Sequence, residues 1–243
     1  MLSRSGRPLA QAIFGPIARL CVRAGISADA VTITGTVAVV ACALILYPLG
    51  HPVWASWIIG ITVIFDSLDG QIARLTGTAS RWGAFLDSTL DRLADSAIFC
   101  GILLWIVRWN IGAATGLTEW LALACLAALP AALCTSYARA RAEAVGFTAN
   151  VGISERADRL VIVLLGALIT GYGASAWVLL VALAYLAVAG WITVAQRMVT
   201  VYRQSRAAAT QAHAEHGADE CVAGDLNSDK QSAGDRAGQG SGQ

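Results

Sequence analysis

Charged residues are scarce in this sequence. Only 14% of its 243 residues are Asp, Glu, Lys or Arg, whereas 56% are hydrophobic. Together with a mean hydropathy of +0.61, this composition excludes an ordinary soluble domain and predicts a membrane protein. The net charge of +1 hides an uneven distribution, so the position of each charge is more informative than the sum.

Three common signals are also missing. The six cysteines are scattered without a C-x-x-C pair, so neither a zinc site nor a disulfide framework is indicated. No signal peptide is evident, because the opening basic residues are not followed by an apolar core with a small-residue cleavage site. The histidines, His51, His213 and His216, lie in a loop and in the C-terminal tail. We therefore expect no imidazole near the acidic cluster described below.

Long apolar runs dominate the rest of the chain. A helix needs roughly 20 apolar residues to cross about 30 Å of hydrocarbon. Six such runs lie near 31–50, 52–68, 84–107, 118–140, 157–175 and 176–200. The stretch "GYGASA" between the last two predicts a tight turn between antiparallel helices. We therefore expect an all-α integral membrane protein with six transmembrane helices.

Arginines cluster on alternate connections between these runs. They lie before the first run, between the second and third, between the fourth and fifth, and after the sixth, whereas the opposite loops contain only Arg108. Basic residues near membrane spans favour the cytoplasmic side. We therefore expect a multi-pass cell-membrane protein with both termini and the active site on the cytoplasmic side.

Two flanking segments differ from the predicted six-helix domain, residues 31–204. In the N-terminal segment, residues 1–30, apolar residues between Pro8 and Val22 recur at helical spacing opposite Arg19 and Arg23. This pattern predicts an interfacial amphipathic helix, with a merely basic flank as the alternative. Residues 205–243 are rich in Ala, Gly, Gln, Ser and Asp. Because such a segment cannot bury a core, we expect a disordered cytoplasmic tail.

Four aspartates interrupt the apolar sequence at helical spacing. Asp66 and Asp69 share one face of the second predicted helix, and Asp87 and Asp91 share one face of the third. Four ionised carboxylates so close together would repel, so a cation between them is expected. Donors that are all oxygen favour Mg²⁺ or Mn²⁺, and four negative charges would balance two divalent ions. Such a site suits a phosphate or diphosphate substrate. The alternative is that the aspartates cap helices or pair with nearby arginines.

Neighbouring residues support a phosphate site. Gly70 and Gly83 each remove a side chain one turn from an aspartate, which would let a bulky ligand approach the helix. Arg74 follows one turn beyond Gly70 and could pair with a phosphate. Asp95 continues the stripe of Asp91, but pairing with Arg92 or a neighbouring hydroxyl is an equal alternative, so it is left outside the metal set.

The aspartates belong to a longer pattern, D-x2-D-G-x2-A-R-x8-G-x3-D-x3-D, which runs from Asp66 to Asp91. This pattern resembles the signature of the CDP-alcohol phosphotransferases. The resemblance implies six transmembrane helices, a homodimer, and transfer of a phosphatidyl group from a CDP-linked lipid to an alcohol with release of CMP. It makes Asp66, Asp69, Asp87 and Asp91 the ligands of two Mg²⁺ ions, and Asp91 also the general base. It further implies that the CDP-diacylglycerol (CDP-DAG) is held by Asp29, Ala30, Val31, Thr32, Gly70, Arg74 and Ser80. For the first four of these, "DAVT", a helix N-cap at Asp29 is the alternative.

Several other stretches bear on the acceptor alcohol. The segments "SRWGAFLDSTLDRLAD", "SYARARAE", "ISERADRL" and "VAQR" resemble those of the actinobacterial phosphatidylinositol phosphate synthases. That resemblance implies inositol 1-phosphate as the acceptor, with its phosphate bound by Ser136, Arg139, Arg156 and Arg197. For Arg141 and Arg159 we favour a purely topological role, because cytoplasmic arginines need no ligand.

Other functions remain open at this point. A phosphatidylglycerophosphate synthase would use glycerol 3-phosphate, whose phosphate suits the same arginines. Membrane prenyltransferases also bind diphosphates through Mg²⁺ and paired aspartate motifs, but those motifs lie farther apart in the chain. A cation transporter could use intramembrane aspartates, although it would not account for the fixed glycine and arginine spacing. The expected partners are CDP-DAG, inositol 1-phosphate, membrane lipid and a second copy of the chain, with no nucleic acid.

Overall fold

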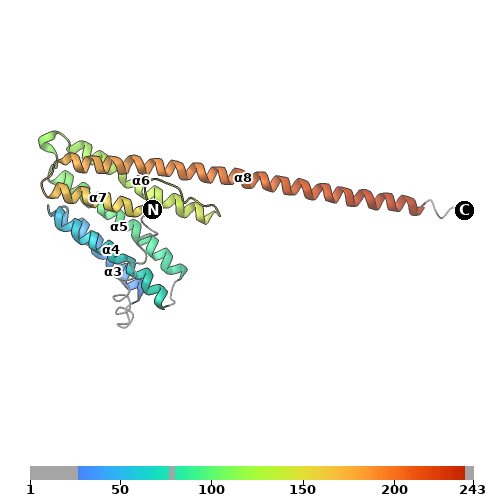
Figure 1. The fold of residues 1–243 in the computed structure, drawn as a ribbon, viewed down its shortest axis with the longest axis horizontal. Helices are drawn as coiled ribbons and strands as arrows, with labels where there is room; N and C mark the ends of the chain where they lie inside the picture. The colour runs from blue at the N-terminus through green and yellow to red at the C-terminus, as the bar shows by residue number, and fades with distance from the viewer. Residues whose placement is uncertain (1–26, 77–79, 239–243) are drawn as a thin grey trace.

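The computed structural model describes the backbone of residues 27–76 and 80–238, and the side chains of residues 27–64 and 80–211. All regular structure in these residues is helical, which confirms the predicted all-α class. The elements are α3 (Ala28–Leu46), α4 (Pro52–Thr76), α5 (Arg81–Arg108), the short 3-10 helix η1 (Ala113–Thr115), α6 (Thr118–Ala144), α7 (Arg156–Gly171) and α8 (Ala176–Gly238) (Figure 1). The expected interfacial helix between Pro8 and Val22 lies outside the described residues.

Local sequence signals explain where these helices begin and turn. The Ser27 hydroxyl accepts a hydrogen bond from the Ala30 N–H at 3.2 Å and caps α3. The alternative of an N-cap at Asp29 is therefore wrong, and Asp29 lies in the first turn of the helix. Ser80 caps α5 in the same way, through the Gly83 N–H at 3.0 Å. Gly173, with φ +96°, provides the left-handed residue in the predicted turn between α7 and α8.

Small residues let the helices pack closely. α3 packs against α4 and α5, α5 against α6, and α8 against both α6 and α7, while α4 also contacts α7. A Cβ added to Gly101 of α5 would overlap the carbonyl oxygen of Ala43 in α3, and one on Gly190 of α8 would lie 2.9 Å from the Ala131 Cβ of α6. Close approach at small residues is the usual means of helix association in a lipid environment.

The apolar surface fits a membrane protein, but fewer helices qualify as spans than the sequence predicted. By length and hydropathy, three described segments could cross a membrane: Ala28–Leu46, Thr118–Ala144 and Ala176–Gln211. α4 contributes the shorter apolar stretch Pro52–Ile64. α5 has aspartates in its first half, and α7 is only 16 residues long. Three candidates, and not six, therefore meet the criterion within the described part of the chain.

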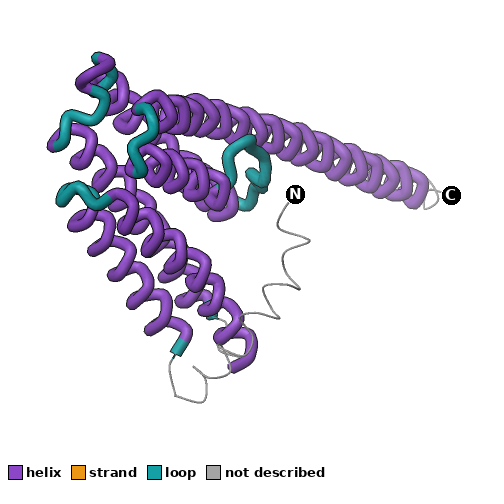
Figure 2. Tube along the Cα trace, turned by 60° about the vertical axis from the view of Figure 1, so that its left-hand side comes forward, coloured by secondary structure: helices purple, strands orange, loops and turns teal. Residues whose placement is uncertain are grey.

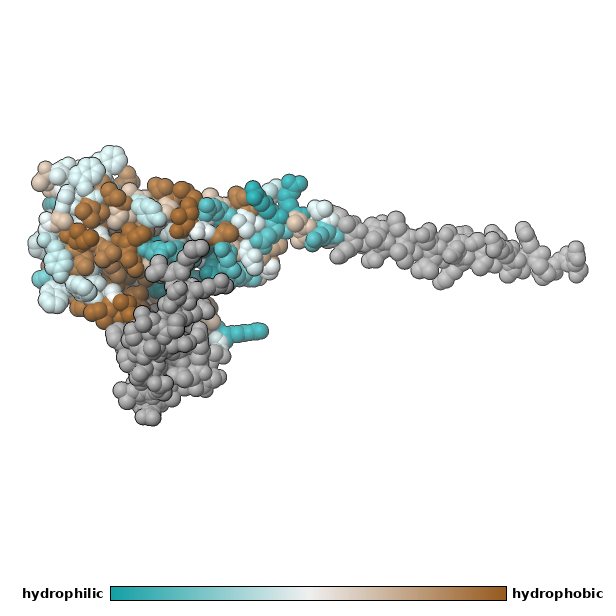
Figure 3. Space-filling view, in the orientation of Figure 1, coloured by the Kyte–Doolittle hydropathy of each residue, from teal (hydrophilic) through white to brown (hydrophobic). Residues whose placement is uncertain are grey.

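The two ends of the bundle differ in chemistry. Exposed aromatic residues gather where α3 joins α4, α5 joins α6 and α7 joins α8: Trp54, Trp57, Trp109, Trp120, Tyr172 and Trp177. Aromatic residues are enriched at both membrane–water interfaces of membrane proteins, and further exposed ones, Trp82, Phe85 and Tyr202, lie elsewhere on the surface. Figure 3 shows apolar residues around the bundle and hydrophilic ones toward the end from which α8 extends. The arginines of α6, α7 and α8 lie at this second end.

The helices converge at the aromatic end and diverge toward the other (Figures 1 and 2). α8 continues beyond the bundle as helical backbone as far as Gly238. Residues 205–238 have helical backbone, and the disordered tail that the sequence predicts from residue 205 stays a prediction. The segment has few large apolar residues; its alanines and glutamines favour a helix, whereas its glycines do not.

Candidate active site

A pocket of about 940 Å³ opens at the diverging end of the bundle. It is lined by the first half of α5, the last turns of α6, the segment that precedes α7, the start of α7 and one residue of α8. Its charged lining residues are Asp87, Asp91, Arg92, Asp95, Arg139, Glu143, Glu155, Arg156, Arg159 and Arg197. The three aspartates form an acidic wall on α5, which also includes Arg92, and four of the arginines form a basic wall on α6, α7 and α8, beside Glu143 and Glu155.

The acidic wall contains half of the predicted metal ligands. Asp87 and Asp91 lie one turn apart on α5, and both are half-buried. Asp66 and Asp69 belong to α4, and their side chains lie outside the description, as do those of Gly70 and Arg74. Within residues 27–64 and 80–211, no three His, Cys, Asp or Glu side chains come together as a metal site. The metal-binding donors that line the pocket are oxygens, with neither His nor Cys among them, which fits a hard divalent cation.

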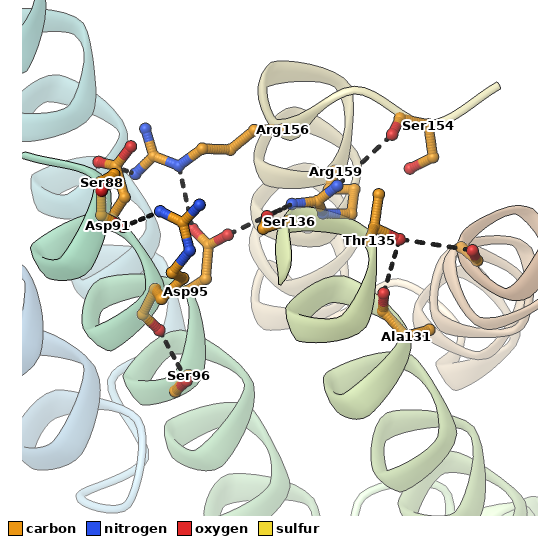
Figure 4. A network of polar contacts seen from close by, with 12 residues as sticks. Ser88, Asp91, Asp95, Ser96, Ala131, Thr135, Ser136, Ser154, Arg156 and Arg159 are labelled. Atoms are coloured by element: carbon orange, nitrogen blue, oxygen red, sulfur yellow. Dashed lines mark hydrogen bonds and ion pairs between the residues drawn. The ribbon is translucent and has the colours of Figure 1, made fainter. Parts of the chain in front are cut away.

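Arg156 joins the two walls. Its Nη2 lies 2.8 Å from Asp91 Oδ1, and its Nε lies 3.4 Å from Asp95 Oδ1 (Figure 4). Because Arg156 begins α7, the first turn of that helix brings a predicted acceptor ligand directly onto the predicted base. The pocket thus places residues of the aspartate motif beside a residue from the arginine-rich connection between the fourth and fifth apolar runs.

Asp95 and Arg159 form a second ion pair deeper in the pocket. Arg159 Nη2 lies 3.5 Å from Asp95 Oδ2, and the side chains are only 4% and 6% exposed, respectively. Arg92, one of the partners considered for Asp95, donates instead to the Ser88 carbonyl oxygen, and Asp95 pairs with Arg156 and Arg159. The purely topological role favoured for Arg159 is also inconsistent with its burial. The aspartate stripe pointed to Asp95, but no local signal identified a partner 64 residues away.

The other residues predicted to bind the acceptor phosphate line the same pocket, but they differ in burial and in the contacts they make. Arg159 Nη2 donates to the Ser136 hydroxyl at 3.4 Å. Arg139 is exposed and pairs with Glu143 at 3.1 Å. Arg197 is 8% exposed; its Nε donates to the Val151 carbonyl at 2.9 Å and its Nη1 to that of Thr135. Arg197 therefore also ties α8 to α6 and to the segment that precedes α7. Arg141, in contrast, is exposed and does not line the pocket.

That segment is fastened to α8 by further hydrogen bonds. The Thr193 hydroxyl accepts from the N–H groups of Ile153 and Ser154, at 3.2 and 3.3 Å. Farther along α8, the Gln204 amide exchanges two bonds with the backbone of Thr148, at 3.0 and 2.7 Å. The roles of Thr193 and Gln204 in holding this segment were not predicted from the sequence, because neither residue belongs to a charged motif.

Residues predicted to hold the CDP group meet near the start of α5. A Cβ on Gly83 would lie 3.5 Å from the Ser80 hydroxyl and 3.7 Å from Asp29 Oδ1. The glycine therefore keeps a space open between the first turns of α3 and α5. Thr32 is buried, and its hydroxyl donates to the Ala28 carbonyl at 3.1 Å. Ala30 is exposed and Val31 half-buried at this end of α3.

An apolar helical bundle with a charged pocket at one end fits a membrane enzyme. Residues 26–202 match the family model described as CDP-alcohol phosphatidyltransferase, so the chain belongs to this family. This result confirms the resemblance found in the aspartate pattern.

Two similar members of the family are both named phosphatidylinositol phosphate synthase. The phosphatidylinositol phosphate synthase of Cutibacterium acnes is 43% identical over 198 residues, which cover 79% of this chain and 93% of that protein. The phosphatidylinositol phosphate synthase of Mycobacteroides abscessus is 43% identical over 189 residues, covering 78% and 83%.

Solved structures agree with these matches. The crystal structure of the Mycobacterium tuberculosis phosphatidylinositol phosphate synthase with CDP-DAG bound has a TM-score of 0.71 and 42% identity, covering 79% of this chain and 94% of that one. The same enzyme in complex with manganese and citrate also gives a TM-score of 0.71 at 42% identity, covering 78% and 88%.

Proposed function

We propose that this chain transfers the phosphatidyl group of CDP-DAG to inositol 1-phosphate, giving phosphatidylinositol phosphate and CMP. The contact between Arg156 and Asp91, 2.8 Å long, carries the proposal, because it joins a carboxylate wall to an arginine wall inside one pocket. Relatives named phosphatidylinositol phosphate synthase, similar over most of the chain, support the same choice of acceptor.

The acidic wall would bind the reacting diphosphate. Two Mg²⁺ ions held by Asp66, Asp69, Asp87 and Asp91 would neutralise the phosphate oxygens and the charge that grows on departing CMP. Mn²⁺ could take the same oxygen ligands, and the M. tuberculosis relative was crystallised with manganese. The CDP group would lie against Ser80, Gly70, Arg74 and the "DAVT" stretch, where Gly83 leaves space beside Asp29.

Asp91 is suited to act as the general base. An acceptor hydroxyl attacks the phosphorus on the diacylglycerol side, a new P–O bond forms, and the bond to CMP breaks with its electron pair leaving on CMP. The hydroxyl proton passes to the Asp91 carboxylate. Arg156 holds this carboxylate at one oxygen and thereby orients it toward the acceptor side of the pocket.

The basic wall would bind the acceptor phosphate. Arginine binds phosphate through charge-assisted, often bidentate hydrogen bonds. Arg156 and Ser136 lie at the pocket surface, while Arg197 is held in place by two backbone carbonyls. Arg139 pairs with Glu143 in an exposed i,i+4 arrangement. Such a pair contributes little to stability, so Arg139 can exchange it for a phosphate at small cost.

We also propose that the α-helices α3 to α8 all cross the cell membrane, including α7 with its 16 residues. The chain would act as one subunit of a homodimer. The exposed aromatic residues would mark the outer interface, and the arginine-lined pocket would face the cytoplasm. In this arrangement the charged half of α5 lies at the cytoplasmic edge, where lipid CDP and a soluble acceptor can meet.

A glycerol 3-phosphate acceptor is the second candidate, since the same arginines would bind its phosphate. The test is CMP release from CDP-DAG by purified protein with Mg²⁺, comparing inositol 1-phosphate, inositol, glycerol 3-phosphate and serine. The proposal predicts release with inositol 1-phosphate alone. Release with glycerol 3-phosphate alone would overturn the choice of acceptor, and release with none would overturn the transferase function.

A further inference from the structure

The Asp95–Arg159 pair is more buried than the contacts at the pocket surface. Its side chains are 6% and 4% exposed, whereas those of Asp91 and Arg156 are 21% and 32% exposed. Burial of two charges is costly, and such a pair is seldom the most stabilising choice for a core. Its presence beside a substrate pocket therefore calls for a role other than stability.

Asp95 is shared between two arginines. Its Oδ2 contacts Arg159 Nη2 at 3.5 Å, and its Oδ1 contacts Arg156 Nε at 3.4 Å (Figure 4). Arg156 is consequently held at two different nitrogens, by Asp95 at Nε and by Asp91 at Nη2. Two contacts fix the plane of a guanidinium, whereas one would leave it free to rotate.

Arg159 in turn reaches three parts of the pocket wall. In addition to Asp95 on α5, it donates to the Ser136 hydroxyl on α6 and to the Ser154 carbonyl before α7, both at 3.4 Å. Within the described part of the chain, its Nε and the buried Ser154 hydroxyl have no hydrogen-bond partner. A buried pair that leaves polar atoms unsatisfied is a poor source of stability, which again favours a positioning role.

We propose that Asp95 and Arg159 are positioning residues that pre-arrange the acceptor site. Asp95 fixes the guanidinium of Arg156, and Arg159 fixes the hydroxyl of Ser136, so that both meet the acceptor phosphate in the correct orientation. This inference rests on the proposed function, because it takes Arg156 and Ser136 as phosphate ligands. Neither Asp95 nor Arg159 needs to touch the reacting atoms.

The test separates positioning from stability. Asp95→Asn keeps the shape of the side chain but removes its charge. The double variant Asp95→Leu/Arg159→Met removes both buried charges, and it should fold even where the single change does not, because apolar residues of similar volume often replace a buried ion pair without loss of stability. For each variant, thermal unfolding, the KM for each substrate and the direct binding of inositol 1-phosphate are measured. Asp158→Asn and Arg141→Met serve as controls, since both residues are exposed and neither lines the pocket.

We expect the KM and Kd for inositol 1-phosphate to rise about tenfold or more in both variants, as a lost charge-assisted contact implies, while the KM for CDP-DAG stays within about twofold. Parental acceptor binding in the folded double variant would overturn the inference. If the variants bind inositol 1-phosphate more weakly than the parent protein, but the parent protein itself shows no turnover, the positioning role stands and the proposed reaction is overturned. If the enzyme accepts only glycerol 3-phosphate, the KM for glycerol 3-phosphate is compared between the variants and the parent protein in the same way.

Discussion

Arg156 Nη2 lies 2.8 Å from Asp91 Oδ1, so the base proposed for the reaction and an arginine proposed for the acceptor are in direct contact. The two residues come from helices α5 and α7, which begin 75 positions apart in the chain, at Arg81 and Arg156. With Arg156 as a phosphate ligand, their contact would place the acceptor phosphate next to the carboxylate proposed to remove the hydroxyl proton. Acceptor binding and proton removal would then be coupled through one ion pair.

Replacing Arg156 should weaken the binding of the acceptor more than the binding of CDP-DAG. In Arg156→Ala the phosphate loses a charge-assisted contact worth about 1.5–3 kcal/mol, so the KM for inositol 1-phosphate should rise roughly 10- to 100-fold. Arg156→Lys should recover only part of this loss, because Lys lacks the planar fork. Steady-state kinetics with each substrate varied in turn provide the measurement. Arg141→Ala is the matched control, since Arg141 is exposed and outside the pocket; an equal effect of Arg156→Ala on both substrates would contradict the assignment.

Removal of the divalent metal should abolish CMP release. Chelation with EDTA is expected to stop the reaction, and added Mg²⁺ or Mn²⁺ to restore it, because the donors lining the acidic wall suit hard cations. Asp91→Asn should lower kcat by about 10²- to 10⁴-fold, as expected for loss of a general base, and metal should not rescue it. Unchanged turnover in EDTA, or an active Asp91→Asn variant, would exclude this use of the acidic wall.

Thr193 should stabilise the segment that precedes α7. In Thr193→Val the N–H groups of Ile153 and Ser154 lose their common acceptor, which should cost about 1–3 kcal/mol of unfolding free energy. Thr200→Val is a suitable control on the same helix, because among the described residues the Thr200 hydroxyl bonds only to the carbonyl of Gln196 within the helix, at 2.8 Å. Thermal unfolding in detergent should show a lower Tm for the first variant alone. Equal melting temperatures would mean that the segment is held by other contacts.

Two glycines should respond in opposite ways to alanine. Gly101→Ala places a methyl group against the Ala43 carbonyl, so overpacking between α3 and α5 should cost about 1–3 kcal/mol. Gly60→Ala adds its methyl where nothing in the described chain lies within 4 Å, and helix propensity should make it neutral or stabilising by up to about 1 kcal/mol. Comparison of the two melting temperatures checks the packing; a stable Gly101→Ala variant would show that the α3–α5 contact is looser than described.

The sequence predicted the helices better than it predicted the contacts between them. The apolar run at 118–140 predicted a helix where α6 covers Thr118–Ala144, and "GYGASA" predicted the turn before α8. Hydropathy does not depend on distant partners, so these local signals were sufficient. The span count was less secure, because α5 combines aspartates with an apolar second half.

The pairing of charges could not be predicted in the same way. Asp87, Asp91, Arg139, Arg156 and Arg197 do line one pocket, as their motif positions implied. The partner of Asp95, however, depends on how α5 and α7 pack, and so does the burial of Arg159. No helical spacing within one segment carries that information.

The most direct test of the central claim follows the phosphate of the acceptor. Purified protein in liposomes that contain CDP-DAG is incubated with Mg²⁺ and inositol 1-phosphate labelled on its phosphate, and the lipid is extracted. We predict that label enters the lipid fraction in step with CMP release, and that Asp91→Asn prevents both. Release of CMP without label in the lipid would contradict the proposal that inositol 1-phosphate is the acceptor.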